Sequence, residues 1–117
     1  MPIVIAGYLD FDPNRAEQMI RDAKPYIDAA LAEPGCVAYT WAIDPLKPGR
    51  VHVFEEWENE AALAGHFSAA SYADMGGHLR AVGILGFDVK KYRVDLIEPV
   101  YDEAGVPRAD FFTEKRA

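Results

Sequence analysis

The chain has little cysteine, an excess of acidic over basic residues, and no long hydrophobic run. Its 117 residues include one cysteine, Cys36, and 12 Lys and Arg against 19 Asp and Glu, which gives a formal net charge of −7. A single cysteine excludes an internal disulfide and a thiolate zinc cluster, so Cys36 is expected to be a small core residue. Because nucleic acids and anionic membranes attract basic surfaces, this charge argues against both as partners.

The hydrophobic stretches are also short. The longest, IVIAGYL at residues 3–9, is far shorter than the roughly 20 residues needed to span a bilayer. No basic segment precedes it as in a secretory signal, so we expect a cytoplasmic protein. With half of its residues hydrophobic, a chain of this length predicts one globular domain with one core.

The first third of the sequence predicts a strand followed by a helix. β-Branched and aromatic residues favour a strand at 3–9. The cap signal Asp12–Pro13 then precedes apolar residues at helical spacing. Pro25 lies inside this pattern and should kink the helix about one turn upstream, because its ring crowds a preceding carbonyl. Gly35 can end the helix in the left-handed conformation.

The rest of the chain predicts a hairpin, two short helices and a last strand. Residues 36–43 and 51–58 read as strands, and the Pro/Gly turn DPLKPG between them indicates an antiparallel hairpin. Asn59 is expected to cap one short helix and Ser71 a second one. Alternating side chains predict the last strand at 87–97.

The resulting order, β-α-β-β-α-β with a divided second helix, predicts the α+β ferredoxin-like fold. In this fold, helices cover one face of an antiparallel sheet. We assign residues 1–98 to this domain and residues 99–117 to a C-terminal extension that packs on the body or on a partner subunit.

The uncovered face of the sheet predicts a homodimer. This face is expected to carry large apolar residues such as Tyr39, Trp41 or Phe54. A bare apolar sheet in water is an interaction surface, which two copies would bury by pressing sheet to sheet.

Four segments together resemble the antibiotic biosynthesis monooxygenase (ABM) family. They are AEPGCVAYTW at 32–41, the DP…PGR turn at 44–50, VFEEWENEAALAGHF at 53–67, and a Y…HL pattern at 72–79. The resemblance covers about residues 3–97. It implies a dimeric α+β barrel, and oxidation of phenols, quinols or anthrones by O2 without a bound cofactor.

The chain departs from two branches of the family that it resembles. In anthrone oxygenases an Asn, a Tyr and an Arg accompany the tryptophan, but here the matching positions are Val53, Leu63 and Gly77, so that only Trp57 is kept. The heme-degrading branch places an Asn where this chain has Gly7. Heme oxygenation is therefore not expected, and neither is any other cofactor.

Oxidation without a cofactor needs a dry pocket, a base, and donors that stabilise a phenolate or enolate. His66 is the first candidate base, since imidazole titrates near neutral pH. His78 and Glu55 are the alternatives, the latter because burial raises the pKa of a carboxyl group. The residues expected to line the pocket are Trp57, Tyr72, Met75, Phe67 and Tyr39. Any of these side chains could instead serve only core packing.

Two other functions stay open at this level. The same scaffold could host an isomerase, lyase or decarboxylase that works by proton transfer alone, which the missing Asn and Arg favour. It could also be a non-catalytic dimeric binding module whose pocket is filled by side chains. No metal site is expected, because the three histidines lack a spacing that would bring two ligands together.

Overall fold

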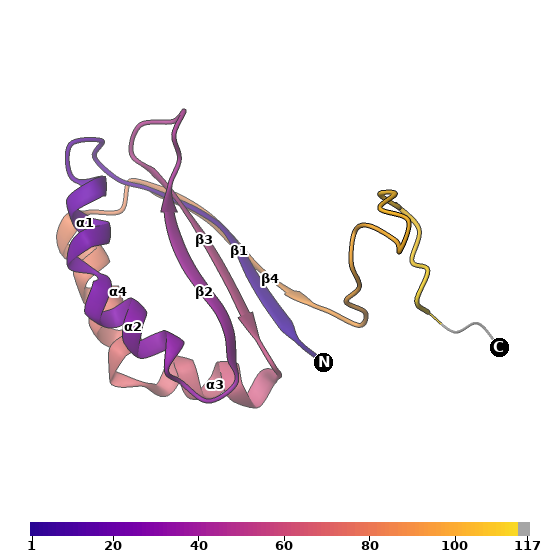
Figure 1. The fold of residues 1–117 in the computed structure, drawn as a ribbon. Helices are drawn as coiled ribbons and strands as arrows, with labels where there is room; N and C mark the ends of the chain where they lie inside the picture. The colour runs from indigo at the N-terminus through magenta and orange to yellow at the C-terminus, as the bar shows by residue number, and fades with distance from the viewer. Residues whose placement is uncertain (115–117) are drawn as a thin grey trace.

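A computed structural model describes residues 1–114 as one sheet backed by four helices (Figure 1). The predicted order of elements is confirmed, with both helical regions divided in two. No helix within these residues is long and apolar enough to cross a bilayer. The elements are β1 (Ile3–Asp10), α1 (Ala16–Asp22), α2 (Lys24–Leu31), β2 (Cys36–Ile43), β3 (Arg50–Trp57), α3 (Glu60–Ser68), α4 (Ala70–Val82) and β4 (Gly86–Arg93).

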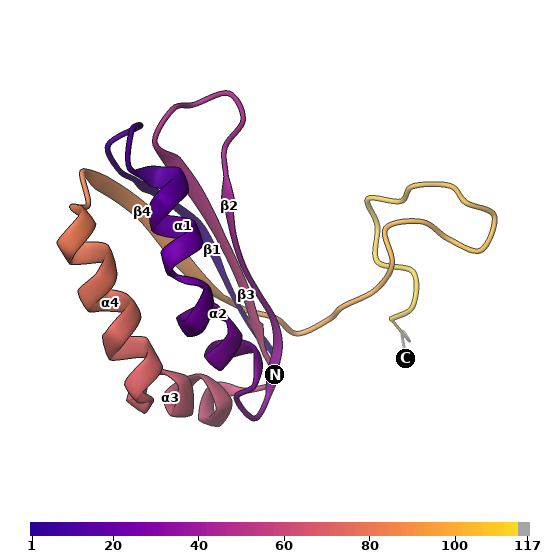
Figure 2. The ribbon, with the colours of Figure 1, turned by 60° about the vertical axis from the view of Figure 1, so that its left-hand side comes forward.

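The sheet has the strand order β2-β3-β1-β4, and every neighbouring pair is antiparallel. Figure 2 shows that the helices all cover the same side of it. This is the predicted α+β ferredoxin-like arrangement. It leaves β4 as one edge of the sheet and one whole face without helices.

The helix ends differ from the prediction in two places. Instead of a kink, the first helical region has a break at Ala23, so that Pro25 lies in the first turn of α2, where a missing N–H is harmless. Asn59 caps α3 as predicted, and its Oδ1 accepts a hydrogen bond from Ala62 N at 2.8 Å. Ser71 is not a cap, because α4 already begins at Ala70.

The last strand is shorter than predicted, because it lacks a partner. β4 ends at Arg93 rather than at residue 97, and the next residue, Val94, donates from its N–H to Pro2 O at 2.9 Å. Because β1 begins at Ile3, β4 has no neighbouring strand to pair with beyond this point.

The structure corrects the predicted faces of two residues of β2. The pairing register of β2 with β3 shifts between Cys36 and Ala38, so Val37 does not share the face of Tyr39 and is 55% exposed. Tyr39 and Trp41 lie on the helix-covered face, not on the open one, because they pair with Glu55 and Val53 of that face. Phe54, which alternates with these residues, does lie on the open face.

Two apolar clusters fill the space between sheet and helices. One lies under α1 and α4 and includes Phe11 and Met19, while the other includes Ile3, Trp57 and Leu63. Cys36 is half-buried and packs against the second cluster.

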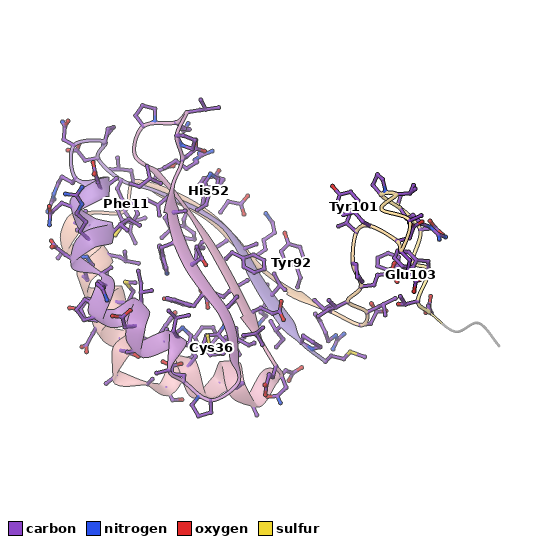
Figure 3. All side chains as sticks on the ribbon, viewed as in Figure 1. Phe11, Cys36, His52, Tyr92, Tyr101 and Glu103 are labelled. Atoms are coloured by element: carbon purple, nitrogen blue, oxygen red, sulfur yellow. The ribbon has the colours of Figure 1, made fainter. Side chains whose placement is uncertain are left out.

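Beyond β4 the chain leaves the body of the domain. Residues 95–114, called the arm below, project away from the sheet in all three views (Figures 1, 2 and 3). The arm is held in shape by its own bonds, in which the Glu98 carboxylate accepts from the N–H groups of Phe112 and Thr113. It does not lie on the body, so packing on a partner is the part of our prediction that stays open. The last three residues of the predicted extension lie outside the described part of the chain.

Gly7 allows β1 and β4 to approach closely. A Cβ at this position would lie 2.1 Å from the backbone oxygen of Asp88, which cannot move without disturbing the ladder. We therefore expect Gly7→Ala to lower the free energy of unfolding by about 1–3 kcal/mol, the usual range for overpacking. Urea unfolding measures this.

The matched control is Gly86→Ala at the start of β4, where a Cβ meets no atom within 4 Å. Its effect should stay within about 0.5 kcal/mol. If Gly7→Ala were equally harmless, the strands could not approach as closely as described.

Candidate functional site

The site begins on β3, where alternation places Glu55 and Trp57 on the helix-covered face. The two side chains are joined directly, because Trp57 Nε1–H donates to Glu55 Oε1 at 3.0 Å. The chain then turns at Asn59 into α3, which presents His66 to the same region. Glu55, Trp57 and His66 are all buried, with exposures of 7%, 0% and 2%.

The ring of His66 lies among aromatic side chains. It stacks on Trp57, with ring centroids 4.5 Å apart and an interplanar angle of 29°. The edges of Tyr39 and Tyr72 meet it at centroid distances of 5.6 and 5.3 Å. These contacts fix the plane of the imidazole, and with it the directions of its two nitrogens.

Each nitrogen of His66 faces a carboxylate. Nδ1 lies 2.8 Å from Glu33 Oε2, and Nε2 lies 3.8 Å from Glu55 Oε1. Ser71 Oγ donates to the other oxygen of Glu33 at 3.0 Å. The result is a row, Glu33–His66–Glu55, with Trp57 bound to its inner end.

The surroundings change the acidity of two groups in the site. Burial raises the pKa of Glu55, and the hydrogen bond from Trp57 and the charge of His66 offset only part of this effect. Burial also raises the pKa of the Tyr39 hydroxyl, while the Trp41 indole lowers it to a smaller extent. Glu55 is thus a carboxyl group whose proton affinity suits a general base, and Tyr39 keeps its proton.

A cavity of about 480 Å³ lies between the sheet and α4, next to this row. Its volume is in the range of sites for small organic molecules. Residues of both apolar clusters form its wall, so it lies where the two clusters meet. The lining residues are Ile5, Leu9, Tyr39, Trp41, Val53, Glu55, His66, Phe67, Tyr72, Met75, Gly76, Leu79, Val89, Lys90 and Lys91.

Six of the eight predicted site residues line this cavity: Glu55, His66, Tyr39, Phe67, Tyr72 and Met75. Trp57 does not line it, since it lies behind Glu55 and His66 and contacts them instead. His78 is placed elsewhere, with its Nε2 2.9 Å from Met19 O in α1 and its ring against Tyr26. The structure therefore does not bring His78 to the other candidates.

Three residues of the site were missed from the sequence. Trp41 was assigned to the open face, although its alternation with Tyr39 could have placed it in the cavity wall. Its buried Nε1–H has no hydrogen-bond partner among the described residues. Lys91 was not among the predicted site residues, although it lines the cavity. Glu33 lies 33 positions before His66, and nothing local indicates that they meet.

Within residues 1–114, no group of three or more His, Cys, Asp or Glu side chains is arranged to hold a metal ion. The remaining histidine, His52, is on the open face, where its Nε2 lies 2.7 Å from Asp44 Oδ2.

The raised pKa of Glu55 predicts a pH-dependent effect on stability. The folded chain holds this proton more tightly than the unfolded chain, so the buried carboxyl lowers stability once the pH rises through its raised pKa. Glu55→Gln keeps the shape and removes the charge. Relative to the parent, the variant should gain stability between pH 4 and pH 8. Urea midpoints at several pH values measure this, and a relative loss toward pH 8 would contradict it.

Comparisons with known proteins identify the family of this chain. A sequence model of the family "Antibiotic biosynthesis monooxygenase" matches residues 2–76, more than half of the chain. The uncharacterized protein sll1783 of Synechocystis is 36% identical over 66 residues, which are 56% of this chain and 45% of that protein. The chain thus matches less than half the length of this relative.

Solved structures share the fold. A candidate antibiotic biosynthesis monooxygenase from Deinococcus radiodurans superposes with a TM-score of 0.76 at 18% identity, covering 86% of this chain and 99% of that one. A conserved protein of unknown function from Bacteroides thetaiotaomicron gives 0.69 at 23% identity, covering 78% and 95%. The family match and the shared fold agree with the resemblance in the sequence. The chain belongs to the antibiotic biosynthesis monooxygenase family.

Proposed function

We propose that the chain is a cofactor-independent cytoplasmic monooxygenase that oxidises a small phenolic, quinol or anthrone-like compound with O2. The observation that carries this proposal is a buried carboxyl–imidazole pair, Glu55 and His66, in the wall of an aromatic-lined cavity. Membership of the family supports it.

The cavity suits a flat aromatic molecule with one ionisable position. Tyr39, Trp41, Phe67 and Tyr72 provide aromatic surface for stacking, and Met75 adds an adaptable apolar contact. Lys91, on the edge strand β4, supplies a positive charge that stabilises a substrate anion.

The reaction balances without a cofactor. Glu55 removes a proton from an activated methylene group, and the resulting carbanion passes one electron to O2. The two radicals combine to a peroxide, and the proton returns to it. The hydroperoxide then loses one water molecule to give a ketone, so that one O2 converts the methylene carbon into a carbonyl carbon and water. The protein supplies the base, a largely apolar cavity and the stabilisation of the anion.

A second candidate is an isomerase, lyase or decarboxylase that uses only the proton-transfer step. The cavity favours it at one point: the position of the anthrone oxygenases' Asn is Val53, an apolar part of the wall. A purely structural module is less well supported, because side chains leave the cavity open.

Oxygen uptake tests the proposal. With anthrone or a quinol as substrate, Glu55→Gln should lower kcat by about 10²-fold or more, the usual contribution of a general base. His66→Ala should have a similar effect, and a chelator none. His78→Gln is the matched control, because this histidine lies outside the cavity, and it should change kcat less than about twofold. Product formed without O2 would select the second candidate, and no uptake across a panel of quinols and anthrones would reject the first.

We also propose that two copies associate through the open face of the sheet. This face carries Val4, Tyr8 and Phe54, and Figure 3 shows Tyr92 on the side away from the helices. Phe54 and Tyr92 are 44% and 51% exposed. In such a dimer the arm can lie on the partner, which would cover its apolar side chains: Ile97, Val100, Tyr101, Val106 and Phe111.

Light scattering tests the dimer. The parent chain should be dimeric at micromolar concentration, and Phe54→Arg should shift it to the monomer by placing a charge in the apolar contact. Leu46→Arg, in the loop between β2 and β3, is the control and should leave the dimer intact, since Leu46 is 91% exposed and off the sheet. A monomeric parent would refute the proposal.

A further inference from the structure

We infer that Glu33 is a positioning residue that holds His66 in the tautomer able to accept a proton from Glu55. Glu33 lies in the connection between α2 and β2, on the far side of His66 from the cavity. It does not line the cavity, so it acts on the substrate only through the imidazole.

The tautomer follows from the contact between Glu33 and Nδ1. An ionised carboxylate can only accept hydrogen bonds, so the 2.8 Å contact places the imidazole proton on Nδ1. Ser71 Oγ donates to the second oxygen of Glu33, which fixes the orientation of this carboxylate. With Nδ1–H given to Glu33, the neutral ring has its lone pair on Nε2, and Nε2 faces Glu55.

This arrangement lets the pair hold a substrate proton in two stages. Glu55 first takes the proton from the substrate carbon. A shift that shortens the 3.8 Å separation then lets the Glu55 O–H donate to Nε2, which gives an imidazolium and restores the Glu55 carboxylate. The imidazolium lies between two carboxylates. Its other proton stays on Nδ1 and is not transferred to Glu33. The same proton returns through Glu55 to the peroxide before water is lost.

The charges around His66 agree with this role. The titratable side chains that face the ring are Glu33, Glu55, Tyr39 and Tyr72. No Lys or Arg within residues 1–114 forms an ion pair with Glu33 or Glu55. His66 is therefore the side chain that both carboxylates face, and the imidazolium formed by proton transfer would lie between them.

NMR of 15N-labelled protein reads the tautomer and needs no substrate. The parent should show His66 protonated on Nδ1 and unprotonated on Nε2. Glu33→Gln should move part of the ring population to the other tautomer, because an amide nitrogen can donate to Nδ1. A parent ring protonated only on Nε2 would overturn the inference.

Proton removal can be measured without oxygen. Under anaerobic conditions in deuterated water, the exchange of the methylene hydrogens of anthrone reports removal of the proton and its release to solvent, without the steps that consume O2. Glu33→Gln should lower kcat for exchange by about tenfold or more with KM changed less than about twofold, since Glu33 does not touch the substrate. Glu33→Asp, which keeps the charge, should recover part of the rate. Equal rates for Glu33→Gln and the parent would overturn the inference.

Glu58→Gln is the matched control. Glu58 lies with Glu33 and His66 along the same outer groove but makes no hydrogen bond to the ring, so its replacement should leave exchange within about twofold. If Glu33→Gln fails to fold, as judged by circular dichroism, Ser71→Ala takes its place. A loss of about two- to fivefold is then expected, and no loss overturns the inference.

The kinetic test rests on the proposed function, but the two ideas can fail separately. If the parent exchanges anthrone hydrogens without consuming O2, the monooxygenase proposal fails and the exchange rates still decide the role of Glu33. If the parent neither exchanges these hydrogens nor consumes O2, the NMR measurement of the His66 tautomer still decides the role of Glu33.

Discussion

The burial of an imidazole between two carboxylates is the constraint on which the rest of the site depends. Ionisable groups with little contact to water are costly unless they are paired. Here the pairing is shared among four elements: Glu33 follows α2, Glu55 belongs to β3, His66 to α3 and Ser71 to α4. The row can form only when the sheet and all these helices are in place.

The same elements explain why the cavity stays open. Its wall is made where the two apolar clusters meet, and the large side chains at that junction are engaged in other contacts. Trp57 stacks on His66 and donates to Glu55. Its side chain therefore lies on the side of these two residues away from the cavity and does not fill the cavity. A tryptophan at this position therefore supports the site without touching what enters the cavity.

Much of this could be predicted from the sequence, because alternation and cap residues are local signals. The order of elements followed from them, as did the positions of Glu55 and His66. The face of Tyr39 and Trp41 did not, because it depends on which residues of β3 they pair with. The family resemblance directed attention to Trp57 and His66, but it assigned no role to Glu33 or Trp41, although both lie in the matching segment 32–41. The role of Glu33 depends on a contact between residues far apart in the chain, which only the fold brings together.

The chemistry that we propose follows from placing charge where water is scarce. Burial that raises the pKa of Glu55 makes it a stronger base, but it also penalises the anion formed from the substrate. A base alone would therefore gain little from burial. The cavity offsets this penalty with the Lys91 ammonium on another wall, which stabilises the negative charge that the substrate gains when Glu55 takes its proton. Since the proton can rest on His66 beside the cavity, its return to the peroxide needs no exchange with bulk water. For the proposed oxidation without a cofactor, the fold must therefore hold the substrate's proton beside the cavity and stabilise the deprotonated substrate.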